Sequence, residues 1–306
     1  MPLFAETLTE RLVSLIDTVP DVADVIELPP PDLGTVQRRA ARLLRSAAEV
    51  AGLRLGDLKL QNQKARSVLS GPAALRAVGF HASGAMTVSL GLDPFDDVVG
   101  EDPGDKELGA LVIRSAESLG LPELIPSEDD LQFERLWRIK AAGGDRTGQV
   151  APAILCRAVG AFRQVTRDLP VYGRASATVE LAAGGRLAAV SVSARRLAGD
   201  EPGTTLDRAK VRPPAEAAGD IVGQLVTAFR DGAADDVRVV PDWFRFGYLS
   251  LGRRRPQGVL APFYIAALSV EHEHERTAHL LVAAGTPQRY LRLPTGQSAA
   301  TRRRAA

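Results

Sequence analysis

Two β-rich segments joined by a pair of glycines constrain the fold of this 306-residue chain more than any other feature. The segments cover residues 175–181 and 187–192, and Gly184-Gly185 lies between them. Glycine accepts the positive φ values that tight hairpin turns require, so the stretch 168–195 predicts a β-hairpin. The stretch predicts local structure only, because none of its residues is a candidate for catalysis.

The rest of the chain predicts helices that alternate with hairpins rather than with single strands. The expected helices are 3–19, 35–51, 106–119 and 215–229, and the expected strands are 75–80, 85–90, 131–139, 237–249, 259–270 and 279–284. Residues 153–166 suit either a helix or a strand, and 199–212 and 271–278 read as a loop and a polar tip. The absence of an alternating strand–helix order favours an α+β fold, with helices packed on curled antiparallel sheets.

Composition and the positions of proline and glycine residues divide the chain into four predicted segments. These are an N-terminal amphipathic helix with a proline-rich linker at 1–34, a helix-plus-hairpin module at 35–125, a larger module at 126–292 and a disordered tail at 293–306. The helix at 3–19 docks on its own domain or forms the contact of a homodimer.

The overall composition is typical of a globular protein. Hydrophobic residues make up 45% and charged residues 25%, with a net charge of +1. Cys156 is the single cysteine, so no internal disulfide can form. Without a signal sequence or a membrane span, the chain is expected to be cytoplasmic unless a leader precedes it. The arginine triplets at 253–255 and 302–304 could contact phosphate, but a solvated loop and a solvated tail are the favoured interpretation, so no nucleic-acid partner is expected.

Residues 131–292 resemble the FTP and PepSY modules of thermolysin-like protease propeptides and of free-standing bacterial proteins. The resemblance rests on Leu169-Pro170-Val171-Tyr172-Gly173, on Gly184-Gly185-Arg186-Leu187, on a helix that starts after prolines, on Leu260-Ala261-Pro262-Phe263-Tyr264-Ile265 and on Ala284-Gly285-Thr286. It implies a cystatin-like module, a helix wrapped by an antiparallel sheet, that binds or inhibits rather than catalyses. Residues 35–92 read as a diverged copy, so the module would be duplicated.

Three histidines form the densest group of potential metal ligands. His272, His274 and His279 alternate with glutamates over a short span. On a strand His272 and His274 share one face, and a hairpin turn could bring His279 opposite one of them, as a three-nitrogen metal site needs. The same pattern is also that of a solvated hairpin tip, and the spacing of zinc proteases is absent.

Aromatic residues gather in the second half of the chain. Phe244, Phe246 and Tyr248 share one face of the expected strand, and Trp243 and Arg245 share the other. They either fill the core or line a concave ligand pocket. The pocket candidates are Trp137, Asp242, Trp243, Phe244, Arg245, Phe246, Tyr248 and Tyr264.

Two functions therefore remain open. The first is a non-enzymatic protein-binding or regulatory and inhibitory protein built from cystatin-like modules. The alternative is a cofactor-independent enzyme, of the cyclase or isomerase type, that acts on a hydrophobic small molecule in a pocket under the second-half sheet. No G-x-S-x-G, P-loop or G-x-G-x-x-G motif occurs, so no cofactor is expected and binding is favoured over catalysis.

Overall fold

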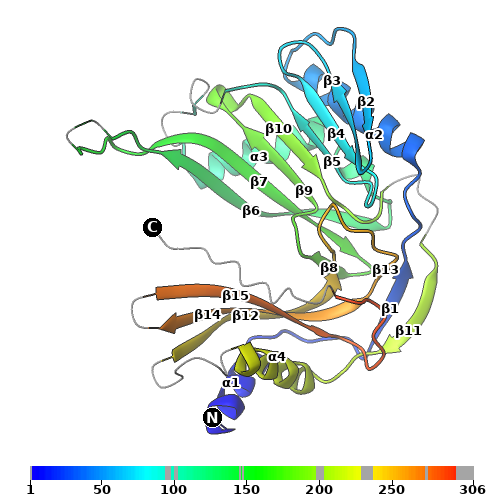
Figure 1. Cartoon of the computed structure of the whole chain (residues 1–306), viewed down its shortest axis with the longest axis vertical. Coiled ribbons are helices and arrows are strands. Elements are labelled where there is room, and N and C mark those ends of the chain that lie inside the picture. The colour runs from blue at the N-terminus through cyan, green and yellow to red at the C-terminus, as the bar shows by residue number, and fades with distance from the viewer. Residues whose placement is uncertain are drawn as a thin grey trace. The chain divides into compact units, whose positions relative to one another are not determined.

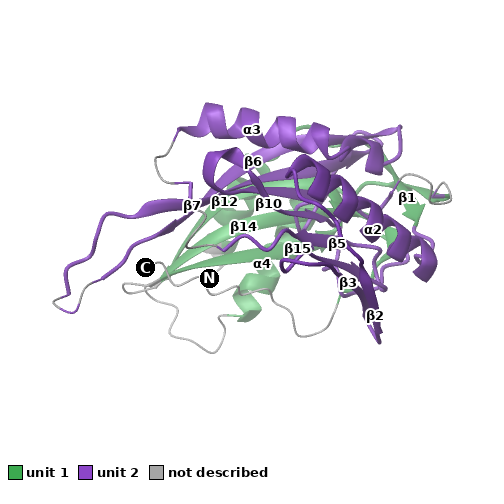
Figure 2. Cartoon of the chain, turned by 90° about the horizontal axis from the view of Figure 1, so that it is seen from above, with its two compact units in different colours: residues 1–27, 204–249, 259–306 green, residues 28–203, 250–258 purple. Residues whose placement is uncertain are grey.

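The computed structural model divides the chain into two compact units. Unit 1 comprises Met1–Glu27, Thr204–Leu249 and Val259–Ala306, and unit 2 comprises Leu28–Gly203 and Ser250–Gly258 (Figure 2). The residues that the structure describes are 2–93, 98–99, 103–144, 146, 148–197, 203–228, 237–272 and 275–293. The division into segments at residues 34, 125 and 292 stays a prediction.

Unit 1 holds an antiparallel sheet covered by helices and a smaller sheet beside them. Its elements are α1 (Pro2–Val13), β1 (Val22–Glu27), β11 (Thr205–Lys210), α4 (Pro214–Ala228), β12 (Val237–Leu249), β13 (Val259–Leu260), β14 (Pro262–His272) and β15 (Glu275–Ala284) (Figure 1). The strand orders are β15-β14-β12 and β11-β1-β13. Helix α4 contacts β14 and β15, and α1 contacts α4 and β12, so Leu8 and Leu12 are buried within unit 1.

Unit 2 is a larger antiparallel sheet with two helices on one face. Its elements are α2 (Leu33–Val50), β2 (Lys59–Gln63), β3 (Arg66–Ser70), β4 (Arg76–Phe80), β5 (Met86–Ser89), α3 (Asp105–Ser118), β6 (Asp129–Ala141), β7 (Ile154–Thr166), β8 (Leu169–Tyr172), β9 (Ala177–Leu181) and β10 (Leu187–Val192). The strands follow the order β7-β9-β10-β5-β4-β3-β2, and β6 and β8 also pair with β7. Helix α2 contacts β3, β4, β5 and β10, and α3 contacts β6, β7 and β9.

The strand registers of unit 2 separate its side chains onto two faces. Met86 pairs with Val192, and Val88 with Val190, and these side chains belong to the core under the helices. The intervening pairs place Thr87 opposite Ser191 and Ser89 opposite Ala189, on the other face. Because successive side chains alternate across a sheet, that second face is the one without helices.

Glycines meet two different backbone requirements in unit 2, a positive φ and a close approach. Gly184 and Gly185 have φ values of 62° and 73° in the turn between β9 and β10, as the Gly-Gly pair predicted. At Gly160 a Cβ atom would lie 2.0 Å from a methyl group of Val112, so a glycine here lets α3 approach β7.

The α+β prediction, with helices packed on antiparallel sheets, is confirmed. The boundaries of several elements differ from the prediction. The first helix ends at Val13, and residues 22–27 of the predicted linker form β1. The predicted loop 199–212 contains β11, whose polar sequence becomes a strand because it pairs with β1. Residues 154–166 form β7.

Candidate functional site

The face of unit 2 without helices carries a recess of about 480 Å³, which we call the basic recess. Strands β3, β4, β5, β9 and β10 form its floor, and the chain after β8 and the loop Ser250–Gly258 add to its lining. Its lining residues are Arg66, Arg76, Val78, Phe80, Thr87, Val88, Ser89, Arg174, Thr178, Glu180, Ala189, Val190, Ser191, Arg253 and Arg254.

Arginine dominates the charge of the basic recess. Among the described residues, Arg76, Arg174, Arg253 and Arg254 form no ion pair with a carboxylate, and Arg66 donates a hydrogen bond from Nε to Gln63 Oε1 at 2.6 Å. The carboxylate in the lining, Glu180, lies 3.4 Å from Nε of the buried Arg157. The recess therefore carries an excess of positive charge, which attracts anions.

The guanidinium group of Arg253 is fixed by an aromatic ring and crowded by like charges. It lies over the ring of Phe80, 5.2 Å from the centroid. Partial burial, and then the positive charges of Arg174 and Arg254, lower the pKa of Arg253. The three guanidinium groups are thus close enough to repel one another, and a bound anion would relieve that repulsion.

Arg195 holds the loop that carries Arg253 and Arg254. Its Nε donates to Ser250 Oγ at 2.9 Å, and its other nitrogens donate to the carbonyl oxygens of Leu251, Gly252 and Arg255. Burial lowers the pKa of Arg195 to about 10, so the side chain still carries its charge at neutral pH. An arginine side chain has several donors in a fixed geometry, so it can donate hydrogen bonds to several carbonyl groups of an irregular loop at once.

Two further contacts fix the same loop. Ser83 Oγ donates to the carbonyl oxygen of Arg253 at 2.6 Å, and the Ser250 amide donates to that of Tyr172 at 2.7 Å. Gly173 has a φ of 117°, and a Cβ there would lie 2.3 Å from the carbonyl oxygen of Ser250. The loop is therefore held from three sides within unit 2.

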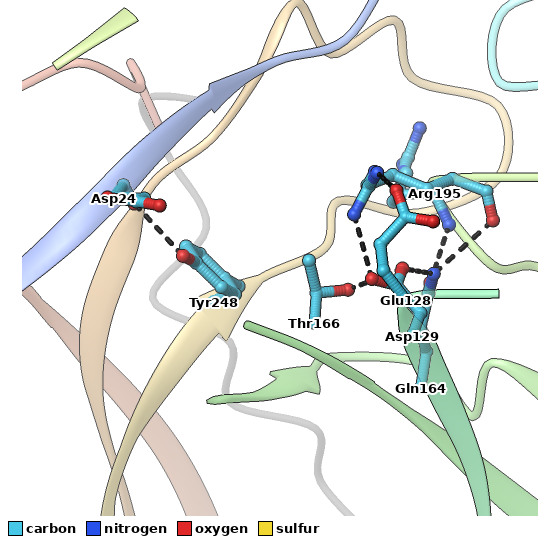
Figure 3. Close-up of polar contacts among 8 residues, drawn as sticks. Asp24, Glu128, Asp129, Gln164, Thr166, Arg195 and Tyr248 are labelled. Carbon is cyan, nitrogen blue, oxygen red and sulfur yellow. Dashed lines mark hydrogen bonds and ion pairs between the residues drawn. The ribbon is translucent and has the colours of Figure 1, made fainter. Parts of the chain in front are cut away.

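A buried polar network continues from Arg195 into the sheet (Figure 3). Gln164 Oε1 accepts a hydrogen bond from the Arg195 amide at 3.2 Å, and Gln164 Nε2 donates to Asp129 at 2.7 Å. Asp129 also accepts from Thr166 at 2.9 Å and from Arg196 at 2.7 Å. Burial raises the pKa of Asp129, although these donors act in the opposite direction.

Four of the eight predicted pocket residues are packed side chains of unit 1. Phe244, Phe246, Tyr248 and Tyr264 are buried. The ring of Tyr264 lies 5.4 Å from that of Phe244 and 5.0 Å from that of Phe246. The Tyr264 hydroxyl donates to the carbonyl oxygen of Arg212 at 2.6 Å. The Tyr248 hydroxyl donates to the backbone carbonyl oxygen of Asp24 at 3.0 Å (Figure 3).

The remaining pocket candidates lie apart from these rings. Arg245 lies over the ring of Trp243 at 5.4 Å, and Asp242 accepts a hydrogen bond from Ser269 Oγ at 2.9 Å. Trp137 belongs to unit 2, where it is 40% exposed on β6 beneath the guanidinium group of Arg135. Whether any of these residues binds a ligand stays a prediction.

Among the three histidines, the structure describes the side chain of His279 alone. Its Nε2 lies 3.0 Å from Thr277 Oγ1, and burial lowers its pKa. The register pairs His279 with Leu268, four residues before His272, which corresponds to roughly 13 Å along a strand. His274 and the side chain of His272 lie outside the described residues. In the described part of the chain no group of three His, Cys, Asp or Glu residues could hold a metal.

The sequence identified Arg253 and Arg254 as part of a basic triplet but not as part of a site. Arg66, Arg76 and Arg174 belong to different segments, and they meet Arg253 and Arg254 only through strand pairing and loop packing. No local motif marks such an arrangement. The available signal was an arginine triplet in an interior loop.

Comparisons with known proteins show the fold and no specific function. No protein-family model and no curated protein matches the chain. An uncharacterized protein from Eubacterium rectale is similar in structure, with a TM-score of 0.52 and 8% identity over 91% of this chain and 89% of that one. The C-terminal domain of Bacillus megaterium YpeB aligns with a TM-score of 0.33 and 7% identity, covering 84% of this chain and 94% of that one. The PepSY resemblance thus stays a prediction. Within the described residues, no helix is long and apolar enough to cross a bilayer.

Proposed function

We propose that this is a non-enzymatic binding protein, whose basic recess holds an acidic segment of a protein partner. The observation that carries the proposal is that Arg76, Arg174, Arg253 and Arg254 lack a carboxylate partner among the described residues. Arginine forms strong, often bidentate hydrogen bonds with carboxylates, so an acidic segment would supply the missing partners.

The form of the recess supports binding. Its floor is a sheet face without helices, on which Thr178 and Ser191 place their hydroxyl groups 2.7 Å apart. The loop that carries Arg253 and Arg254 is already fixed by Arg195 and Ser83, so little further ordering is needed when a ligand binds.

The chemistry of the lining favours binding over catalysis. Glu180 is paired with Arg157, and burial raises its pKa while Arg157 acts in the opposite direction. Among the described lining residues no His, Cys, Tyr, Lys or second carboxylate accompanies it as a partner for acid–base catalysis. In unit 1 the rings of Phe244 and Phe246 contact the ring of Tyr264, and the hydroxyls of Tyr248 and Tyr264 donate to backbone carbonyl groups. The hypothesis of a pocket enzyme has no comparable observation in its favour.

Fluorescence anisotropy with a labelled peptide of aspartate and glutamate tests the proposal. We expect saturable binding that weakens as salt is added, and no binding of the same peptide with asparagine and glutamine in place of the acids. The Arg174→Gln/Arg254→Gln variant should bind at least tenfold more weakly.

The matched control is Arg42→Gln/Arg45→Gln, which removes the same charge from exposed positions of α2, a helix on the opposite face of the sheet. Equal weakening by the two double variants would mean that net charge alone is measured, and the proposal would fail. Tighter binding of a single-stranded oligonucleotide than of the acidic peptide would also overturn it.

A further inference from the structure

We infer that Arg174, Arg253 and Arg254 form a subsite for a doubly charged phosphoryl group, carried by a phosphorylated serine or threonine in the acidic segment that binds the recess. This inference rests on the proposed function and names the chemistry of one end of that ligand.

The three arginines converge from two separate parts of the chain. Arg174 follows β8, and Arg253 and Arg254 belong to the loop Ser250–Gly258, yet all three line the same recess. Arg174 and Arg254 are near enough to Arg253 for their charges to shift its pKa downward. Three positive charges therefore line the same recess, and none of them forms an ion pair within the described residues.

A phosphoryl group matches this cluster better than a carboxylate does. A phosphorylated side chain carries a charge of about −1.5 to −2 at neutral pH and three acceptor oxygens, whereas a carboxylate carries one negative charge and two oxygens. Planar guanidinium groups bind phosphate through paired hydrogen bonds, and arginine clusters are a recurring means of recognising phosphorylated peptides.

The protein holds these like charges together before any ligand binds. The ring of Phe80 lies against the Arg253 guanidinium, and Ser83 fixes the Arg253 backbone. Arg195 donates hydrogen bonds to the carbonyl oxygens of Leu251, Gly252 and Arg255, on both sides of Arg253 and Arg254 in the loop. Because Arg253 and the loop backbone are fixed before binding, a phosphoryl group would need less ordering of this part of the site.

The surroundings favour a group on a chain over a free ion. A second recess, of about 530 Å³, shares Arg76 and Ser89 with the basic recess and adds Leu75, Leu92 and Asp93 to the lining, so a segment that continues into it would meet apolar contacts and one acidic residue there. The hollow surface thus continues beyond the arginine cluster across β4 and β5. An extended segment can occupy it on both sides of the shared residues.

Three labelled peptides test the inference, identical except for serine, glutamate or phosphoserine at one position among acidic residues. Anisotropy at constant salt should show phosphoserine binding about tenfold more tightly than glutamate, and glutamate more tightly than serine. Arg174→Lys/Arg254→Lys keeps the charges but removes the planar donors, so it should weaken binding of the phosphoserine peptide more than that of the glutamate peptide and reduce the preference for phosphoserine severalfold. Arg76→Lys, at the other end of the recess, should keep the preference.

The outcomes separate this inference from the proposed function. Equal affinity for the glutamate and phosphoserine peptides overturns the phosphoryl subsite but leaves the acidic segment in place. Binding of none of the three peptides overturns both. If inorganic phosphate competes as strongly, mole for mole, as the phosphoserine peptide, the site takes a free ion and the inference fails. Unchanged thermal unfolding of each variant ensures that lost binding reports on the site.

Discussion

The two units use antiparallel sheets in opposite ways. In unit 1, β12 and β14 bury Phe244 and Tyr264 against each other, and the Tyr264 hydroxyl has a backbone acceptor. In unit 2, the face without helices presents arginines that lack carboxylate partners in the described part of the chain. The difference teaches that the buried aromatic side chains form a packed core in unit 1. The arginines of unit 2 that lack carboxylate partners among the described residues instead identify the surface where a ligand would bind.

The two arrangements also differ in what a substitution would change. A buried aromatic ring contributes to the free energy of folding through the area it removes from water and through its ring contacts. An arginine without a carboxylate partner contributes little to the free energy of folding. Its hydrogen-bond donors stay available to bind a ligand. Stability should therefore respond to the aromatic residues of unit 1, and binding to the arginines of unit 2.

The largest expected effect is that of Phe244→Ala. Phe244 is fully buried and stacks on Tyr264, so the free energy of unfolding should fall by about 3–5 kcal/mol. Denaturant unfolding measures this loss. The double variant Arg174→Gln/Arg254→Gln should be as stable as the parent. A Phe244→Ala protein that keeps its stability but loses affinity for a hydrophobic small molecule would instead favour a pocket in unit 1.

The next effect depends on pH and concerns Tyr264. Burial raises its pKa to about 12 from an ordinary value of 10.0. The unfolded chain therefore loses the phenolic proton at lower pH than the folded chain. The stability that Tyr264 contributes is present below about pH 10 and is lost as the pH rises through about 12, on the order of 2–3 kcal/mol. Unfolding measured across this range should show a shallower decline for Tyr264→Phe, and equal declines would contradict the assignment.

A smaller effect is expected inside unit 2, from Asp129→Asn. The side chain of Asp129 is buried and binds Arg196, Gln164 and Thr166, so the amide would leave the Arg196 charge poorly compensated. Unfolding should be easier by about 1–3 kcal/mol. The neighbouring Asp130→Asn is the control, because Asp130 is exposed and should tolerate the change. Equal effects would show that the network adds nothing to the stability of unit 2.

Local periodicity was enough to predict much of the fold. The spacing of apolar residues and the flanking glycine predicted a helix at 35–51, where α2 is found. The alternation around Phe244 predicted β12 with its observed ends. Both elements have patterns that are complete within their own sequence, so no distant partner is needed to recognise them.

Features that depend on distant pairing could not be predicted in the same way. The sequence Thr205-Leu206-Asp207-Arg208-Ala209-Lys210 lacks alternation of apolar and polar residues, and it becomes β11 only because β1 lies beside it. The basic recess is a stronger case, since its arginines come from separate segments. The pocket prediction for unit 1 rests mainly on aromatic residues that lie close together in sequence, and the residues of a hydrophobic core have the same pattern.

The pairing of β1 with β11 has a consequence for the order of events during synthesis. Glu27, the last residue of β1, precedes Thr205, the first residue of β11, by roughly 180 residues. At a ribosomal rate of about 5–20 residues per second, β1 waits roughly 10–40 s for this partner. Until then Val25 and Ile26, fully buried in the finished protein, have no native neighbour strand. Val25 and Ile26 are thus made long before their partner strand, and this segment needs protection from aggregation while synthesis continues.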